Sequence, residues 1–164
     1  MNGTTALKTN LEETKSLLEK YLADFSDADI QVRPVPNANH VAWQIGNVIA
    51  GEHFMLQAGL PDAKFPELPP GFADRHSSKA AGVEGPEGLL TKDEYLALFN
   101  GVRGAAIAAL DTLTDADLDR PTEGPMAAFA PTLGHVFLAT ANHTMMHAGQ
   151  FSVIRRVLGK PVLF

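Results

Sequence analysis

The sequence predicts an all-α protein, a four-helix bundle with a long crossover between its second and third helices. Four segments carry apolar residues at the i, i+3/i+4 and i+7 spacing of amphipathic helices, and none shows the sustained alternation of a strand. Between the second and third segments, residues 60–90 contain five prolines and four glycines, which exclude a long helix there. The 164 residues fit a single domain spanning residues 1–164. A bundle with one long crossover accommodates these observations.

The first two helices are expected at about residues 5–25 and 39–60. In the first, an apolar stripe is formed by Leu7, Leu11, Leu18, Tyr21, Leu22 and Phe25. The second, NHVAWQIGNVIAGEHFMLQAGL, is apolar on nearly all faces. Such a pattern is typical of a well-buried helix.

The third helix, at about residues 91–113, has the clearest start signal in the sequence. Thr91 and Glu94 have the spacing of a capping box, in which the threonine hydroxyl accepts from the Glu94 amide and the glutamate carboxylate reaches back to the cap. An apolar stripe follows. Within it, Gly101 and Gly104 predict close packing, because a glycine costs a helix about 1 kcal/mol relative to alanine.

The fourth helix is expected from Pro131 to about Leu158, where Gly159 and Pro161 stop it. The segments that end the first and third helices, FSDADIQVRP and LTDADLDRP, share Asp-Ala-Asp, an aliphatic residue and Arg-Pro in the same order. Two interpretations remain open. The two segments are unrelated turns built from common turn residues, or they mark two related helix pairs, first–second and third–fourth.

Composition and charge exclude several classes of function. Thirteen Lys and Arg against nineteen Asp and Glu give a net charge of −6, which disfavours nucleic acid as a partner. The absence of cysteine excludes disulfides, thiolate nucleophiles and Cys-based metal sites. No apolar run approaches the roughly 20 residues of a membrane span, and the N-terminus lacks the apolar core of a signal peptide. We therefore expect a soluble, cytoplasmic protein with no membrane partner.

His143 and His147 are the candidate metal ligands of the fourth helix. Four residues apart, they lie one turn above each other on the face that carries Val136 and Ile154, which should face the core. Two imidazoles in this geometry can chelate one metal ion. The alternative is a pair of core histidines that bond to neighbouring side chains or water. Because position 144 is threonine, the glutamate of the zinc-peptidase motif is absent.

A metal site needs at least one further ligand, and the second helix can supply it. Asn47 shares one face of that helix with His40 and Gly51, whereas His53 lies about 240° away around the helix axis. Asn47 and His40 are therefore candidates by position, and His53 is expected at the surface. His135 lies about 80° from the first histidine of the fourth-helix pair and can flank the site.

Two segments resemble the DinB-like superfamily of metal-binding four-helix bundles: NHVAWQIGNV in the second helix and ANHTMMHAGQFSVIRRVLGKP in the fourth. The order helix, helix, long crossover, helix, helix is also similar. The resemblance implies a divalent metal, zinc or nickel, held by one histidine of the second helix and two of the fourth. His143 and His147 match the latter two, and Gln150 matches the family's Gly-Gln. Asn47 stands where the family has its first histidine, and an amide oxygen is a poor ligand for these metals. The site would then bind metal weakly, recruit His40 or have lost its metal.

The resemblance also implies candidate functions. Related proteins transfer bacillithiol, mycothiol or glutathione, low-molecular-weight thiols whose thiolate a metal would hold and whose pKa it would lower. We accordingly expect a metal-dependent thiol S-transferase or a hydrolase-like enzyme that acts on a small-molecule thiol or electrophile. Arg155 and Arg156 could bind an anionic thiol, or could complement the helix dipole in solvent. The alternative is a non-catalytic, damage-inducible, stress-associated bundle that binds a small ligand or a weakly held metal.

The sequence also predicts a homodimer. A bundle buries only one broad stripe of each helix, so several apolar residues of the second helix need another cover: Val41, Ile45, Ile49 and Leu56. The C-terminal VLGKPVLF adds an apolar tail, and related bundles are often dimers. The alternative is that the crossover folds back over these positions with its apolar residues Phe65, Leu68 and Phe72.

Overall fold

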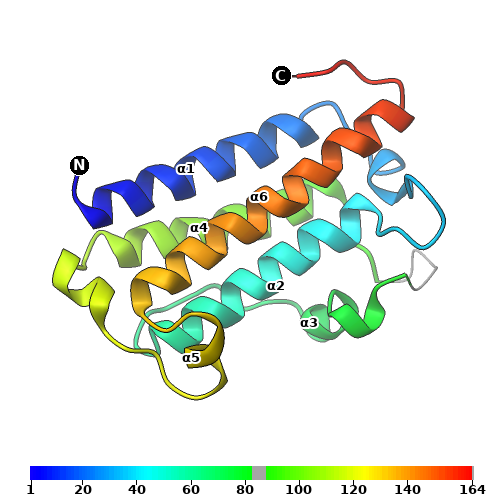
Figure 1. The fold of residues 1–164 in the computed structure, drawn as a ribbon. Coiled ribbons are helices and arrows are strands. Elements are labelled where there is room, and N and C mark those ends of the chain that lie inside the picture. The colour runs from blue at the N-terminus through cyan, green and yellow to red at the C-terminus, as the bar shows by residue number, and fades with distance from the viewer. Residues whose placement is uncertain (83–87, 164) are drawn as a thin grey trace.

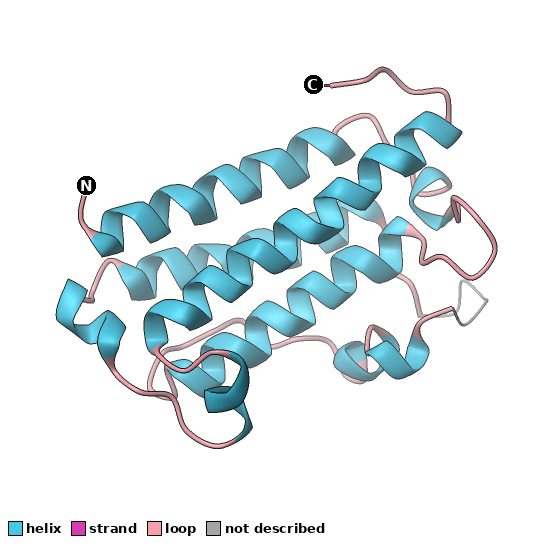
Figure 2. Ribbon diagram, viewed as in Figure 1, coloured by secondary structure: helices cyan, strands magenta, loops and turns pink. Residues whose placement is uncertain are grey.

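The computed structural model describes residues 1–82 and 88–163 and confirms the all-α four-helix bundle (Figures 1 and 2). Its long helices are α1 (Gly3–Leu22), α2 (Val41–Gly59), α4 (Lys92–Leu110) and α6 (Leu133–Val157). Short helices occupy the connections: η1 (Asp29–Gln31), α3 (Phe72–Arg75), η2 (Ser78–Ala80), η3 (Asp115–Asp119) and α5 (Pro125–Phe129). The crossover between α2 and α4 carries only short helices in its described part, as its prolines and glycines predict.

The long helices interleave rather than pair in sequence order. α1 and α2 each pack against both α4 and α6, so α1 and α2 lie on one diagonal of the bundle and α4 and α6 on the other (Figure 1). The two sequence halves therefore do not form separate hairpins side by side. Every long helix finds its main neighbours in the other half of the chain.

The two Asp-Ala-Asp segments have similar structures and the same role, although the 3-10 helix begins at the second aspartate of the first segment, Asp29, and at the first aspartate of the other, Asp115. Each forms a 3-10 turn after a long helix, and its first aspartate caps a long helix of the other half. Asp27 accepts from the Lys92 amide at the start of α4 at 2.7 Å. Asp115 accepts from the Gly3 and Thr4 amides at the start of α1 at 3.1 and 2.9 Å. This reciprocal capping favours the interpretation of two related helix pairs.

The predicted helix starts are confirmed for α4 and shifted for α6. At α4 both hydrogen bonds of the Thr91–Glu94 capping box are present. α6 begins at Leu133, two residues later than expected. Pro131 instead lies in a loop that folds back on residues 121–122, where its carbonyl accepts from the Thr122 amide at 3.1 Å. That contact holds Pro131 outside the helix.

The two glycines of α4 differ in their surroundings. A Cβ on Gly101 would lie 3.4 Å from the Pro66 ring, so the crossover packs closely there, as predicted. A Cβ on Gly104 would have no neighbour within 4 Å, so the prediction of close packing was wrong at that position.

Two apolar clusters fill the bundle, and a polar layer separates them. In α1, for example, Leu11 precedes Thr14 in one cluster and Leu18 follows it in the other. Each long helix contributes one buried polar residue to this layer: Thr14, Glu52, Arg103 and Thr144.

The apolar residues of α2 that the sequence left uncovered are buried within the single chain. Val41, Ile45, Ile49 and Leu56 are at most 1% exposed. The crossover contributes to this cover, because Phe72 belongs to the same core cluster as three of them and Leu68 packs against it. These positions therefore give no reason for a second copy of the chain.

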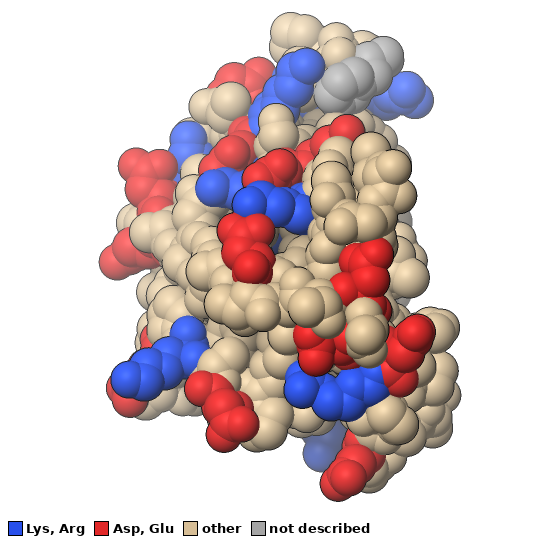
Figure 3. Space-filling view, turned by 90° about the vertical axis from the view of Figure 1, so that its left-hand side faces the viewer, with Lys and Arg blue, Asp and Glu red and all other residues tan. Residues whose placement is uncertain are grey.

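The surface carries both signs of charge. On the face shown in Figure 3, where α1 begins, Lys and Arg are interspersed with Asp and Glu. In the described part of the chain, none of the helices combines the length and the apolar character needed to cross a bilayer.

Candidate metal centre

Three predicted side chains meet between α2 and α6. His143 Nε2 lies 3.1 Å from Asn47 Oδ1, His147 Nε2 lies 3.2 Å from the same oxygen, and the two Nε2 atoms are 3.2 Å apart. These atoms form a nearly equilateral triangle, which we call the donor triangle. The structure thus brings together the histidine pair of the fourth helix and Asn47, one of the two candidates that share a face of the second helix.

Local sequence explains why the rings can approach α2. Four-residue spacing stacks His143 and His147 on the face of α6 that packs against α2. One turn beyond Asn47, Gly51 has no side chain, and a Cβ there would lie only 3.0 Å from His143 Cε1. The glycine therefore leaves room for the His143 ring against the α2 backbone.

The orientation of the Asn47 amide is set by the crossover. Its Nδ2 donates to the backbone carbonyl of His76 at 2.7 Å. A carbonyl can only accept, so nitrogen must occupy this side of the amide and oxygen must face the histidines. The crossover thus directs a lone-pair atom into the donor triangle.

The tautomer of His147 is set by Gln44 in the same way. Gln44 Nε2 donates to the Asn39 carbonyl at 2.8 Å, which leaves Gln44 Oε1 to accept from His147 Nδ1 at 3.1 Å. With its proton on Nδ1, the neutral imidazole presents a lone pair at Nε2. Histidines that bind metals have such a partner on the other ring nitrogen.

Burial keeps the two imidazoles in the neutral form. Burial, together with the neighbouring His143, lowers the pKa of His147 to about 4, and burial also lowers the pKa of His143. At neutral pH both rings are therefore unprotonated at one nitrogen, the form in which imidazole binds a metal.

The donor set fits a divalent cation by chemistry and by spacing. Asn47 Oδ1 and His147 Nε2 lie 3.2 Å apart, and neither atom carries a proton that it could donate to the other. Nitrogen and oxygen ligands at 2.0–2.1 Å from a metal, at angles between 90° and 109°, would be separated by about 2.9–3.4 Å. All three edges of the triangle lie in this range. Across residues 1–82 and 88–163 no three His, Asp or Glu side chains converge as a metal site would require, and the atom that accompanies the two imidazoles here is the amide oxygen of Asn47.

The other predicted residues lie outside the triangle. His40 is the N-cap of α2, where its Nδ1 accepts from the Trp43 amide at 3.0 Å. His53 is half-buried and bonds through Nε2 to the Pro66 carbonyl, so it points away from the site as its helical position predicts. His135 is exposed on α6 and contacts the Thr132 hydroxyl. Arg155 is 2% exposed and is bound to Asp24, so its guanidinium is not free for a ligand.

Sequence analysis missed Gln44 and His76. Gln44 lies one turn before Asn47 on an apolar helix. Two amide side chains three residues apart on such a helix share a face, and this signal could have identified Gln44. His76 lies in the crossover, where no periodicity places it. Its buried ring bonds to the Phe72 carbonyl and to the Tyr95 hydroxyl, both at 2.8 Å. The ring lies so close to α2 that a Cβ on Gly46 would come within 2.0 Å of it.

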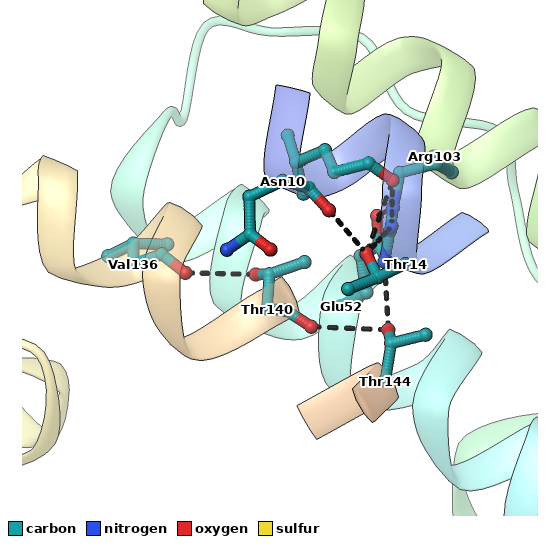
Figure 4. A network of polar contacts seen from close by, with 8 residues as sticks. Asn10, Thr14, Glu52, Arg103, Val136, Thr140 and Thr144 are labelled. Atoms are coloured by element: carbon teal, nitrogen blue, oxygen red, sulfur yellow. Dashed lines mark hydrogen bonds and ion pairs between the residues drawn. The ribbon is translucent and has the colours of Figure 1, made fainter. Parts of the chain in front are cut away.

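The polar layer beside the triangle is built around an ion pair between Arg103 and Glu52, and every N–H group of the guanidinium has a hydrogen-bond partner (Figure 4). Arg103 binds both carboxylate oxygens of Glu52 through Nε and Nη2, each at 2.8 Å. Its remaining donors reach the Leu11 carbonyl and the hydroxyls of Thr14 and Thr144 at 2.7–2.8 Å. All five N–H groups of the guanidinium are used, and all four long helices take part. Sequence analysis missed this pair as well, although an acid and a base in apolar helices are unusual enough to signal it.

Comparison with known proteins gives a match to one family and a fold shared with solved structures. A profile of the DinB superfamily matches residues 10–151. A conserved protein from Enterococcus faecalis has a TM-score of 0.69 at 18% identity, over 98% of this chain and 99% of that one. YfiT from Bacillus subtilis, described as a probable metal-dependent hydrolase with an unusual four-helix bundle topology, has a TM-score of 0.64 at 17% identity. That match covers 96% of this chain and 89% of YfiT. None of the curated protein sequences matches the chain.

Proposed function

The chain belongs to the DinB superfamily, and from this premise we propose that it is a metal-dependent enzyme whose His143, His147 and Asn47 hold one divalent cation. The observation that carries the proposal is the donor triangle, in which the Nε2 atoms of the two imidazoles and the amide oxygen of Asn47 lie 3.1–3.2 Å apart. Zinc or nickel suits the two imidazoles. The neutral amide predicts a lower affinity than a third imidazole would give.

The chain's own residues prepare this site. Gln44 holds the proton of His147 on Nδ1, and the His76 carbonyl keeps Asn47 Oδ1 turned inward. His143, His147 and Asn47 would hold a divalent cation with open positions, and its chemistry there would be to polarise a substrate oxygen and to lower the pKa of a bound water or thiol. Glu52 does not serve as a base, because both its oxygens accept from Arg103.

Hydrolysis is the reaction that we propose. It needs only water as co-substrate, and the fold is shared with YfiT, which is described as a probable metal-dependent hydrolase. Transfer of a low-molecular-weight thiol would also need groups that recognise a charged thiol. Arg155, one of two residues considered for this role, is instead committed to Asp24 and to the Pro161 carbonyl.

A non-catalytic bundle that holds its metal weakly is the second candidate. One observation favours it: the third donor is a neutral amide oxygen, which binds zinc and nickel poorly. The two candidates share the donor triangle and differ in turnover.

Metal content and turnover test both candidates. Protein purified without a His-tag should bind one Zn²⁺ or Ni²⁺ by calorimetry, and the His143→Ala/His147→Ala variant should bind none. His53→Ala removes a histidine outside the triangle and should bind as the wild type does. Equal stoichiometry in the double variant would reject the ligand assignment. Ester hydrolysis by loaded wild-type protein, lost in the double variant, supports the enzyme; metal binding without turnover on esters and amides supports the second candidate.

A further inference from the structure

An apolar groove of about 780 Å³ opens at the surface beside the donor triangle. Its walls come from α2, α5 and α6, and α5 lies at the front of the bundle beside the end of α2 and the start of α6 (Figure 1). The large side chains that line it are Phe54, Met55, Phe129, Leu138 and Met146. Phe54 and Phe129 are 65% and 68% exposed, a high degree of exposure for phenylalanine.

The groove is continuous with the donor triangle through one residue. His143 contributes its Nε2 to the triangle and is also part of the groove lining. Gly51 lines the groove as well, and the His143 ring packs against its backbone, where a Cβ would lie only 3.0 Å from the ring. A molecule seated in the groove would therefore lie against a residue that we propose as a metal ligand.

The lining is almost free of charge. Among the described residues, it includes no Lys, Arg, Asp or Glu, and its polar members are His135, Asn142 and His143. A second groove of similar volume, at the ends of α2 and α4, contrasts with it, because Lys64 and Glu123 are among its lining residues. A charged group placed in the apolar groove would lose hydration without gaining an ionic partner.

We propose that this groove binds an uncharged aromatic or alkyl group of the substrate and presents the adjoining polar end to the donor triangle. The role of the triangle in this statement rests on the proposed function. The volume lies within the range of about 300–1,000 Å³ for small-molecule sites. The substrate class is thus an apolar ester or amide rather than a charged peptide or sugar.

Two fluorescent probes that share the anilinonaphthalene ring system test the groove in metal-free protein. N-phenyl-1-naphthylamine is neutral, and 8-anilino-1-naphthalenesulfonate adds one negative charge. We expect saturable binding of the neutral probe with one site per chain, and at least tenfold weaker binding of the sulfonate. Equal binding of both probes, or no binding of the neutral one, would overturn the proposal.

A matched pair of variants locates the binding. Leu138→Arg places a charge in the groove and should weaken the neutral probe at least tenfold. Val153→Arg makes the same change at an exposed position of α6 outside the groove and should leave binding unchanged. Equal binding by wild type and Leu138→Arg would overturn the assignment. Self-association of the protein can be monitored by sedimentation. If probe binding is lost as the protein self-associates, a second copy occupies the groove, and that result would also overturn the assignment.

Proximity to the triangle has its own readout. In protein loaded with paramagnetic Co²⁺, the proton resonances of the bound neutral probe should broaden, and with Zn²⁺ they should not. Binding without broadening in Co²⁺-loaded protein would overturn the link between groove and triangle. If no metal binds while the probe still binds and responds to Leu138→Arg, the proposed function fails and the apolar groove stands.

Discussion

Replacement of Asn47 by histidine should increase the affinity of the donor triangle for Zn²⁺ and Ni²⁺. The position already provides the support that a ligating histidine needs. Asn47 Nδ2 donates to the His76 carbonyl at 2.7 Å, and an imidazole with Nδ1–H on that side would keep this bond. Its Nε2 would then point toward His143 and His147.

The expected gain is about tenfold in Kd. Structural zinc sites with four ligands yield roughly 10–16 kcal/mol, or about 3 kcal/mol for each ligand. If the amide oxygen already supplies about half of that, the imidazole adds about 1.5 kcal/mol, which is roughly a factor of ten. Space limits the gain, because Asn47 Oδ1 already lies 3.1 and 3.2 Å from the two Nε2 atoms and a longer side chain must separate the rings.

Calorimetric titration at neutral pH, with a competing chelator where needed, measures the effect. Asn47→Ala is the control in the opposite direction: it removes the third donor and should weaken binding. Circular dichroism and the urea midpoint verify that each variant is folded. An Asn47→His protein that is folded but binds no more tightly than the wild type would refute the reasoning, and would place the metal away from Asn47.

Three further predictions concern stability and assembly. Burial lowers the pKa of both His147 and His40 to about 4. As the pH drops from about 6.5 towards 4, these two histidines take up protons in the unfolded chain but not in the folded one, so the free energy of unfolding should fall. The urea midpoint should therefore be lower at pH 5 than at pH 7. Arg103→Met alone should cost about 3–5 kcal/mol in urea unfolding, because it leaves Glu52 buried without its partner, and adding Glu52→Leu should recover much of that loss. We predict a homodimer through the exposed apolar residues Val157 and Val162 of the C-terminal segment, which lie outside the groove. Sedimentation equilibrium should then give more than the 17.5 kDa of one chain, and a mass of 17.5 kDa at every concentration would exclude the dimer.

The features that repeat along a helix could be predicted from the sequence. The four helices, the capping box at Thr91 and the shared face of His143 and His147 follow from spacing, because an α-helix has a fixed rise and rotation. The same geometry favours Asn47 over His53 as a neighbour of the histidine pair, and in the structure Asn47 contacts both rings whereas His53 bonds to the Pro66 carbonyl. Spacing is informative wherever the partner lies on a regular element.

The contacts that cross from one segment to another could not be predicted. His76 orients Asn47 from an irregular crossover, and helical periodicity cannot place a loop residue against a helix. Pro131 was expected inside α6 on local preference, but a bridge to the preceding loop keeps it out. Local propensity is a weak prior that tertiary contacts override.

The buried ion pair between Arg103 and Glu52 explains how the two helices that carry the donor triangle, α2 and α6, are held in a fixed position relative to each other. Arg103 binds Glu52, the residue after Gly51, and also Thr144, the residue after His143. One guanidinium thus connects α2 and α6 within a single residue of the point where the His143 ring meets α2. Functional side chains must be held within roughly 0.5 Å of their working geometry, whereas a buried ion pair adds little net stability compared with apolar packing. The value of the pair therefore lies in position, and the double replacement of Arg103 and Glu52 should disturb metal affinity more than it disturbs folding.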